Sequence, residues 1–328
     1  MVTVPSPDAP ASASSPSRRE QSRARYPDET GFIERDGVRV FWDRYRALRD
    51  ETGNGRTILL MPTWSIVHSR RWKFQIPFLA RHWNVVAFDG RGNGRSDRPA
   101  DEAAYADTEF VADAVGVLDA IGVERAVVVG LSMGGGWGLR LAAEHPDRVE
   151  ALILEGAAVA IADPVPGKRN PPADEALDEY EGWGKYNFHY WRQNYPDFAA
   201  FFFGECLSEP HSTKGTEDCI GWALETDPET LILTDTAPYL SSAPSDPEAS
   251  EPHVIARAFA ARVRCPSLVI HGTDDHIVSF RHGEYLATAL GARFQPIGGG
   301  GHLPGNRDPV RYNLLLRDFI RSLPGGSR

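Results

Sequence analysis

The sequence has 328 residues, of which 41% are hydrophobic and 24% are charged, as is usual for a globular protein with one large core. Its formal net charge of −10 argues against non-specific binding to nucleic acid, which requires a basic face. The N-terminal residues lack the apolar centre of a signal peptide, and no apolar run approaches the roughly 18 residues that span a bilayer. Three cysteines, Cys206, Cys219 and Cys265, cannot all pair. We therefore expect a cytoplasmic protein without a membrane partner.

The chain begins with a segment of low apolar content. Residues 1–25 are rich in Ser, Pro and Ala and show no apolar periodicity, which predicts a disordered tail. The first part of the α/β core is expected over 26–156. It starts with two runs of alternating apolar and polar residues that flank Asp36 and Gly37. An Asp-Gly pair between such runs predicts a β-hairpin.

Short apolar runs follow at intervals along the chain. They predict buried strands at 57–61, 84–89, 125–131, 151–156, 267–272 and 293–297. Residues 108–121 have helical periodicity, and a final helix over 308–323 starts with Asp308 as N-cap and Pro309 at the first helical position. Strands that alternate with helices predict an α/β fold with a mostly parallel central sheet flanked by helices.

The alternation is interrupted once, between residues 157 and 262. This stretch of about 100 residues is too long for a loop and has no run typical of a buried strand, so we expect an inserted helical lid. The core then resumes over 263–328. Part of the predicted lid is dense in aromatic residues. We expect most of their side chains to form the lid's own core and a few to line an apolar pocket. These residues are Trp183, Tyr186, Phe188, Tyr190, Trp191 and Phe198.

The segment "GLSMGG" lies between a predicted strand and a predicted helix. Gly130, Ser132 and Gly134 occupy the places of a Gly-x-Ser-x-Gly turn, which holds its serine in a strained and exposed position. The pattern has only three fixed positions, so a purely structural turn is the alternative interpretation. The first backbone N–H of the following helix, at Met133, would favour developing negative charge.

A nucleophilic serine needs a base and an acid, which the sequence supplies further along the chain. His302 lies in a glycine-rich loop between a strand and the last helix, and Asp275 follows the strand at 267–272. The other histidines are interpreted as surface or core residues. The chain order of serine, acid and histidine matches that of the Gly-x-Ser-x-Gly hydrolases.

These segments together resemble the α/β-hydrolase superfamily. The resemblance rests on "GLSMGG", "HGTDDHIV", "GGGGHLP" and "FDGRGNGRSDRP", and covers roughly residues 31–156 and 263–323. It implies that the acid is the fourth residue of a Gly-x-x-Asp segment, which is Asp275 when counted from Gly272. Asp274 and Glu155 are the two rivals, since some members of the superfamily keep an acid at the position of Glu155. The turn "GLSMGG" is similar to those of small lactonases and of cofactor-free haloperoxidase-like esterases.

The loop that should complete the oxyanion hole departs from the superfamily pattern. Members usually carry His-Gly after the first parallel strand, whereas this chain has Met61 and Pro62. Because Pro62 has no N–H, the second donor beside Met133 is expected to be the N–H of Thr63, with Trp64 as the alternative. The "PTWS" stretch is also similar to haloalkane dehalogenases, but those enzymes use an aspartate nucleophile, and Ser132 argues against that chemistry.

Two further patterns are not taken as sites. Cys206, His211 and Cys219 do not have the spacing of a zinc site, so we expect no metal. The "GRGNGRS" segment lacks the lysine and spacing of a phosphate-binding loop, so Arg91 and Arg95 are expected to be structural or solvated. No cofactor is expected.

The sequence thus favours a serine hydrolase with Ser132, His302 and Asp275 as its triad. The expected partner is a small-to-medium apolar substrate with an ester, lactone or thioester bond. A carbon–carbon bond hydrolase would use the same residues, and a lyase, a cyclase or a ligand receptor on the same fold is the alternative class. Substrate identity and oligomeric state are left open.

Overall fold

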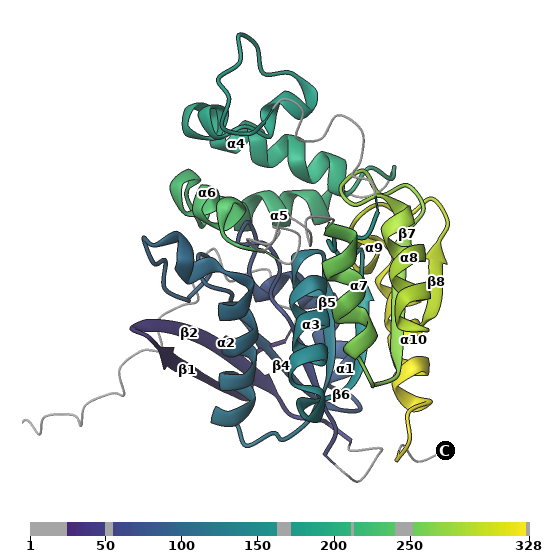
Figure 1. Ribbon diagram of the computed structural model, residues 1–328. Coiled ribbons are helices and arrows are strands. Elements are labelled where there is room, and N and C mark those ends of the chain that lie inside the picture. The colour runs from purple at the N-terminus through teal and green to yellow at the C-terminus, as the bar shows by residue number, and fades with distance from the viewer. Residues whose placement is uncertain (1–24, 50–54, 163–171, 211–212, 240–251, 326–328) are drawn as a thin grey trace, which may run out of the picture.

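The computed structural model describes residues 25–49, 55–162, 172–210, 213–239 and 252–325 (Figure 1). All but the last residue of the predicted tail, 1–25, lies outside the described residues. The strands are β1 (Glu29–Arg35), β2 (Val38–Tyr45), β3 (Thr57–Leu60), β4 (Asn84–Phe88), β5 (Ala126–Leu131), β6 (Val149–Glu155), β7 (Ser267–Gly272) and β8 (Arg293–Ile297). The predicted runs therefore correspond to strands within a few residues at each end.

The described strands form one sheet in the order β1-β2-β4-β3-β5-β6-β7-β8. The strands from β3 to β8 pair in parallel, while β2 is antiparallel to both β1 and β4. The β1–β2 hairpin turns at Asp36 and Gly37, whose φ angles of 51° and 77° are the positive values that a tight primed turn requires. The predicted α/β fold with a mostly parallel sheet is confirmed.

Helices cover both faces of this sheet. The α-helices are α1 (Ile76–Leu79), α2 (Asp107–Ala120), α3 (Met133–Glu144), α4 (Phe188–Cys206), α5 (Lys214–Ala223), α6 (Pro228–Thr236), α7 (Pro252–Arg262), α8 (Phe280–Leu290), α9 (Pro304–Arg307) and α10 (Pro309–Arg321). Short 3₁₀ helices occupy η2 (Ser69–Phe74), η3 (Glu102–Tyr105), η4 (Pro146–Arg148) and η5 (Gly182–Lys185). The predicted cap is present, since the Asp308 side chain accepts from the N–H of Arg311.

Successive strand residues belong to two different cores, as the period of two in a strand requires. Ile58 and Leu60 pack with residues of α1, α10 and the lid helices, whereas Leu59 between them packs with residues of α2, α3, α7 and α8. The sheet is therefore buried on both faces, which explains why its strands are continuously apolar in sequence.

Helices α4, α5 and α6 lie over one end of the sheet, above the carboxyl ends of the parallel strands (Figure 1). Helix α4 is kinked, because Asn194 departs from helical angles and Pro196 follows within the helix. Helix α7 ends the segment predicted as a lid, yet it contacts α3 and α8 in the layer against the sheet. Within the described residues, no helix is both long and apolar enough to cross a bilayer.

Candidate active site

Ser132 stands between β5 and α3 in an unusual backbone conformation. Its φ of 53° and ψ of −123° fall in a region that costs a residue other than glycine of the order of 1–3 kcal/mol. Among the described residues other than glycine, Asp36 and Ser132 have positive φ, and Asp36 belongs to a surface hairpin. Strain that persists in a tightly packed turn points to a role for the serine itself.

The glycines around Ser132 are required by close backbone approach. A Cβ at position 130 would lie 2.2 Å from the carbonyl oxygen of Gly134, and a Cβ at position 134 would lie 1.9 Å from the carbonyl oxygen of Pro62. The turn is therefore tight, and the loop at Pro62 lies directly against the start of α3. Because Met133 opens the helix, its N–H has no partner within the helix.

His302 is held beside Asp275. Its Nδ1 lies 2.8 Å from Oδ2 of Asp275, and both side chains are almost fully buried. The second carboxylate oxygen, Oδ1, accepts the backbone N–H groups of Ile277 and Val278 at 2.8 and 2.9 Å. These bonds fix the carboxylate so that one oxygen is directed at the imidazole.

A second histidine also contacts this carboxylate. His271, on β7, places Nε2 3.1 Å from Oδ2 of Asp275 and 3.0 Å from the carbonyl oxygen of Val278. Burial by itself would raise the pKa of Asp275, but the charge of a protonated His302 and the hydrogen bonds from His271 and His302 hold that pKa well below its usual range. The carboxylate therefore stays ionised at neutral pH. No sequence pattern indicated this contact of His271.

The two rival acids lie elsewhere. The side chain of Asp274 is 61% exposed and lies 3.5 Å from His276. Glu155 is fully buried, and its Oε1 accepts the N–H of Gly305 at 2.9 Å while Oε2 lies 3.5 Å from Nη2 of Arg71. Of the three acids considered from sequence, Asp275 is the one hydrogen-bonded to His302.

The loop that carries His302 is attached to the end of α4. The N–H of His302 donates to the carbonyl oxygen of Cys206 at 3.0 Å, and the N–H of Gly301 donates to Oε1 of Glu209 at 2.8 Å. Arg307 adds hydrogen bonds to the carbonyl oxygens of Leu207 and Glu209. The position of the histidine thus depends on a helix about 100 residues earlier in the chain.

The loop after β3, whose sequence departs from the superfamily pattern, is fixed by three side chains. Trp72 donates from Nε1 to the carbonyl oxygen of Met61, and Trp64 donates from Nε1 to Oγ1 of Thr234 in α6. Asn93, in the segment "GRGNGRS", donates to the carbonyl oxygen of Ser65. That segment therefore supports this loop, and Arg91 in it is buried in an ion pair with Asp113, as expected for a structural arginine.

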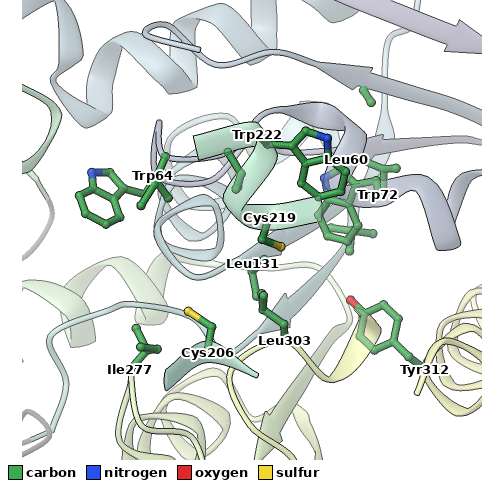
Figure 2. Packing of buried hydrophobic residues seen from close by; sticks show 14 of the residues in the cluster. Leu60, Trp64, Trp72, Leu131, Cys206, Cys219, Trp222, Ile277, Leu303 and Tyr312 are labelled. Carbon is green, nitrogen blue, oxygen red and sulfur yellow. The ribbon is translucent and has the colours of Figure 1, made fainter. Parts of the chain in front are cut away.

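Thr63 is buried, and its Oγ1 has no hydrogen-bond partner within the described chain. Together with Ser132 and His302 it lines one pocket beneath the lid. Most of the remaining wall is apolar, and includes Trp64, Leu131, Phe202, Phe203 and Leu303. Figure 2 shows that Leu131, Cys206, Cys219 and Leu303, which come from different elements, gather in this region.

Sequence reasoning missed several of these wall residues. Phe202 and Phe203 lie at the end of the aromatic stretch of α4, yet the aromatic residues singled out from sequence are absent from the described wall of this pocket. Trp191 and Phe198 are fully buried in a cluster that joins lid residues to residues of the sheet, α1 and α10. Cys206 and Cys219 line the pocket, whereas His211 lies outside the described residues. Arg71 also lines the pocket and had no signal in the sequence.

Two curated relatives match parts of the chain. Over 87 residues the chain is 49% identical to 2-hydroxymuconate semialdehyde hydrolase of Pseudomonas sp. (strain CF600), which is 26% of this chain and 30% of that protein. Over 100 residues it is 38% identical to a putative carbamate hydrolase of Caulobacter segnis, or 30% of this chain and 38% of that protein. These matches each span well under two thirds of the curated relatives' lengths.

A solved structure matches over most of the chain. The structure described as Est816, an N-acyl homoserine lactone degrading enzyme, has a TM-score of 0.67 and 25% identity, covering 88% of this chain and all of that one. The family described as alpha/beta hydrolase fold matches residues 56–305, which include Ser132, Asp275 and His302. The chain therefore belongs to the α/β-hydrolase family.

Proposed function

We propose that the protein is a serine hydrolase in which Ser132 is the nucleophile, His302 the base and Asp275 the acid that orients the base. The observation that carries the proposal is a strained serine on the same pocket as a histidine hydrogen-bonded to a buried carboxylate. Because a carboxylate only accepts, Nδ1 of His302 carries the proton of that bond. The other ring nitrogen of a neutral imidazole, Nε2, is then available to accept the serine proton.

The reaction proceeds in two steps. Ser132 Oγ bonds to the carbonyl carbon as its proton moves to His302, and the tetrahedral oxyanion is held by the N–H groups of Met133 and Thr63. Collapse expels the alcohol or thiol, which takes the proton from His302. Water, deprotonated by His302, then cleaves the acyl-enzyme to the carboxylic acid and free Ser132.

The proposed substrates are esters, lactones or thioesters of small-to-medium size with apolar parts. The mostly apolar wall of the pocket supports the apolar character of such a substrate. The solved structure with 25% identity is that of a lactone-degrading enzyme, and this similarity supports an acyl bond as the target.

A second candidate is hydrolysis of a carbon–carbon bond by the same three residues. The observation that favours it is the 49% identity over 87 residues to a hydrolase of 2-hydroxymuconate semialdehyde, a compound that contains no ester. Activity on esters but not on such a ketonic or aldehydic diene acid would distinguish the first candidate from the second.

The proposal is tested by labelling with a fluorophosphonate, in which an activated serine oxygen bonds to phosphorus and fluoride leaves. We expect one adduct per chain by intact mass, located on Ser132 by peptide mapping and absent from Ser132→Ala. Circular dichroism of both proteins serves as the control for folding. A folded wild-type protein without an adduct would contradict an activated nucleophile and shift the assignment to a non-hydrolytic protein on the same fold.

A further inference from the structure

Arg71 is a buried charge on the wall of the candidate active site. It lies in η2, and its side chain is 3% exposed. Among the residues that line the pocket with Ser132 and His302, Arg71 alone carries a permanent charge. A guanidinium is costly to bury in an apolar wall unless its donors are used.

The hydrogen bonds of Arg71 are incomplete. Nη2 donates to Oδ1 of Asn306 at 3.3 Å and lies 3.5 Å from Oε2 of Glu155. Nε and Nη1 have no hydrogen-bond partner anywhere in the described part of the chain. The guanidinium carbon lies 3.7 Å from the centre of the Trp72 ring, and this stacking holds the group in place.

Glu155 does not use the remaining donors. Its Oε1 is occupied by the N–H of Gly305, and Oε2 lies beyond hydrogen-bond distance of Arg71. The pair therefore offsets the arginine charge without satisfying two of its three nitrogens. Thr63 Oγ1, on the same wall, is a further buried polar atom without a partner among the described residues. Each buried polar atom without a partner requires an explanation, and on the wall of a pocket a bound ligand can supply one.

We infer that Arg71 binds a carboxylate of the substrate, so that the natural substrate carries a carboxylate in addition to the bond that Ser132 attacks. This inference rests on the proposed function, because it assigns a substrate class to the same pocket. A carboxylate has one charge and two acceptor oxygens, which one guanidinium can satisfy. A phosphate monoester, with a charge near −2 and three acceptor oxygens, would leave acceptors unpaired against this largely apolar wall.

The test compares two esters with the same leaving group and chain length. They are the mono-4-nitrophenyl ester of adipic acid and the 4-nitrophenyl ester of adipic acid monoamide, which differ in a carboxylate against a neutral amide. We expect the wild-type protein to prefer the carboxylate ester by about 10- to 100-fold in kcat/KM, the range of a hydrogen-bonded charge. Arg71→Met is expected to abolish the preference, and Arg71→Lys to retain part of it.

Arg70→Met is the matched control. Arg70 is the preceding residue and is also buried, but it hydrogen-bonds to Glu225 and does not line the pocket. The ratio of kcat/KM values for the two esters is expected to survive this change, whatever the absolute rates. Equal kcat/KM for both esters in the wild type, or a preference unchanged in Arg71→Met, would overturn the inference.

Binding without turnover separates this inference from the proposed function. Calorimetric titration with adipate and with adipamide, neither of which carries an ester, is expected to show adipate binding at least about 10-fold more tightly. If neither ester is turned over but adipate retains this advantage, the proposed hydrolase fails and the carboxylate site stands. If both esters are turned over and adipate has no advantage, the carboxylate site fails and the hydrolase stands. The wild-type titration also decides the matter if Arg71→Met does not fold.

Discussion

Replacing Asp275 with asparagine is expected to lower ester turnover about 10⁴-fold, as loss of the acid does in other Ser-His-Asp triads. The carboxylate accepts from Nδ1 of His302 at 2.8 Å, and an asparagine amide group can instead donate to that nitrogen. Donation to Nδ1 would favour the ring tautomer with its proton on Nε2, which cannot accept the proton of Ser132. The measurement is kcat/KM for a 4-nitrophenyl ester, with the melting temperature recorded beside it.

Asp274→Asn is the matched control for this change. The Asp274 side chain is 61% exposed, and its backbone N–H donates to the carbonyl oxygen of Gly300, which the substitution leaves intact. Its ion pair with His276 is a surface contact, so the variant is expected to lose less than about fivefold in kcat/KM. Similar losses in the two variants would remove the assignment of Asp275 as the acid.

Gly134→Ala is expected to destabilise the fold by about 3 kcal/mol, at the upper end of the usual cost of overpacking. The added Cβ would lie 1.9 Å from the carbonyl oxygen of Pro62, which is backbone and cannot rotate away. Relief of the clash must move Pro62 and with it Thr63, the residue proposed to donate to the oxyanion. We therefore expect lower ester turnover in addition to lower stability, measured by urea unfolding and by kcat/KM.

Gly138→Ala, one turn further along α3, provides the comparison. There the added Cβ would meet Leu152 and Val128 at 3.4 Å, an ordinary van der Waals distance. Alanine is favoured over glycine inside a helix by roughly 0.5–1 kcal/mol, so this variant is expected to be as stable as the wild type or slightly more stable. Equal destabilisation by the two substitutions would show that the close approach at Gly134 is not what requires glycine there.

Features set by neighbours in the chain could be predicted from sequence. The hairpin at Asp36-Gly37, the buried strands and the cap at Asp308 each depend on a few adjacent residues, and the structure confirms them. The turn at Ser132 is only partly of this kind. Glycine is required at 130 by the carbonyl oxygen of Gly134, four residues away, whereas at 134 it is required by Pro62, which is remote in the chain. Local patterns of this kind can be predicted from sequence because turn geometry and side-chain periodicity are local properties.

Contacts between distant segments cannot be predicted from the sequence in the same way. Phe202 and Phe203 line the pocket while Trp191 and Phe198 do not, and periodicity alone cannot say which face of α4 is directed at the pocket. Helix α7 lies against α3 and α8, although its sequence gives no sign of which surface it covers.

By itself, the sequence determined the α/β fold and the position of the turn that carries Ser132. It also led to the proposal of Ser132, His302 and Asp275 as the triad, with Asp274 and Glu155 as rival acids. Only the tertiary structure decided that Asp275, rather than Glu155 or Asp274, is hydrogen-bonded to His302, and that Arg71 lies on the pocket wall. The reason is physical: an arginine or a carboxylate is solvated by default, and whether it is buried depends on which remote segments pack around it. For Arg71 those segments are the end of β6 with Glu155 and helix α9 with Asn306, both more than 80 residues away in the chain.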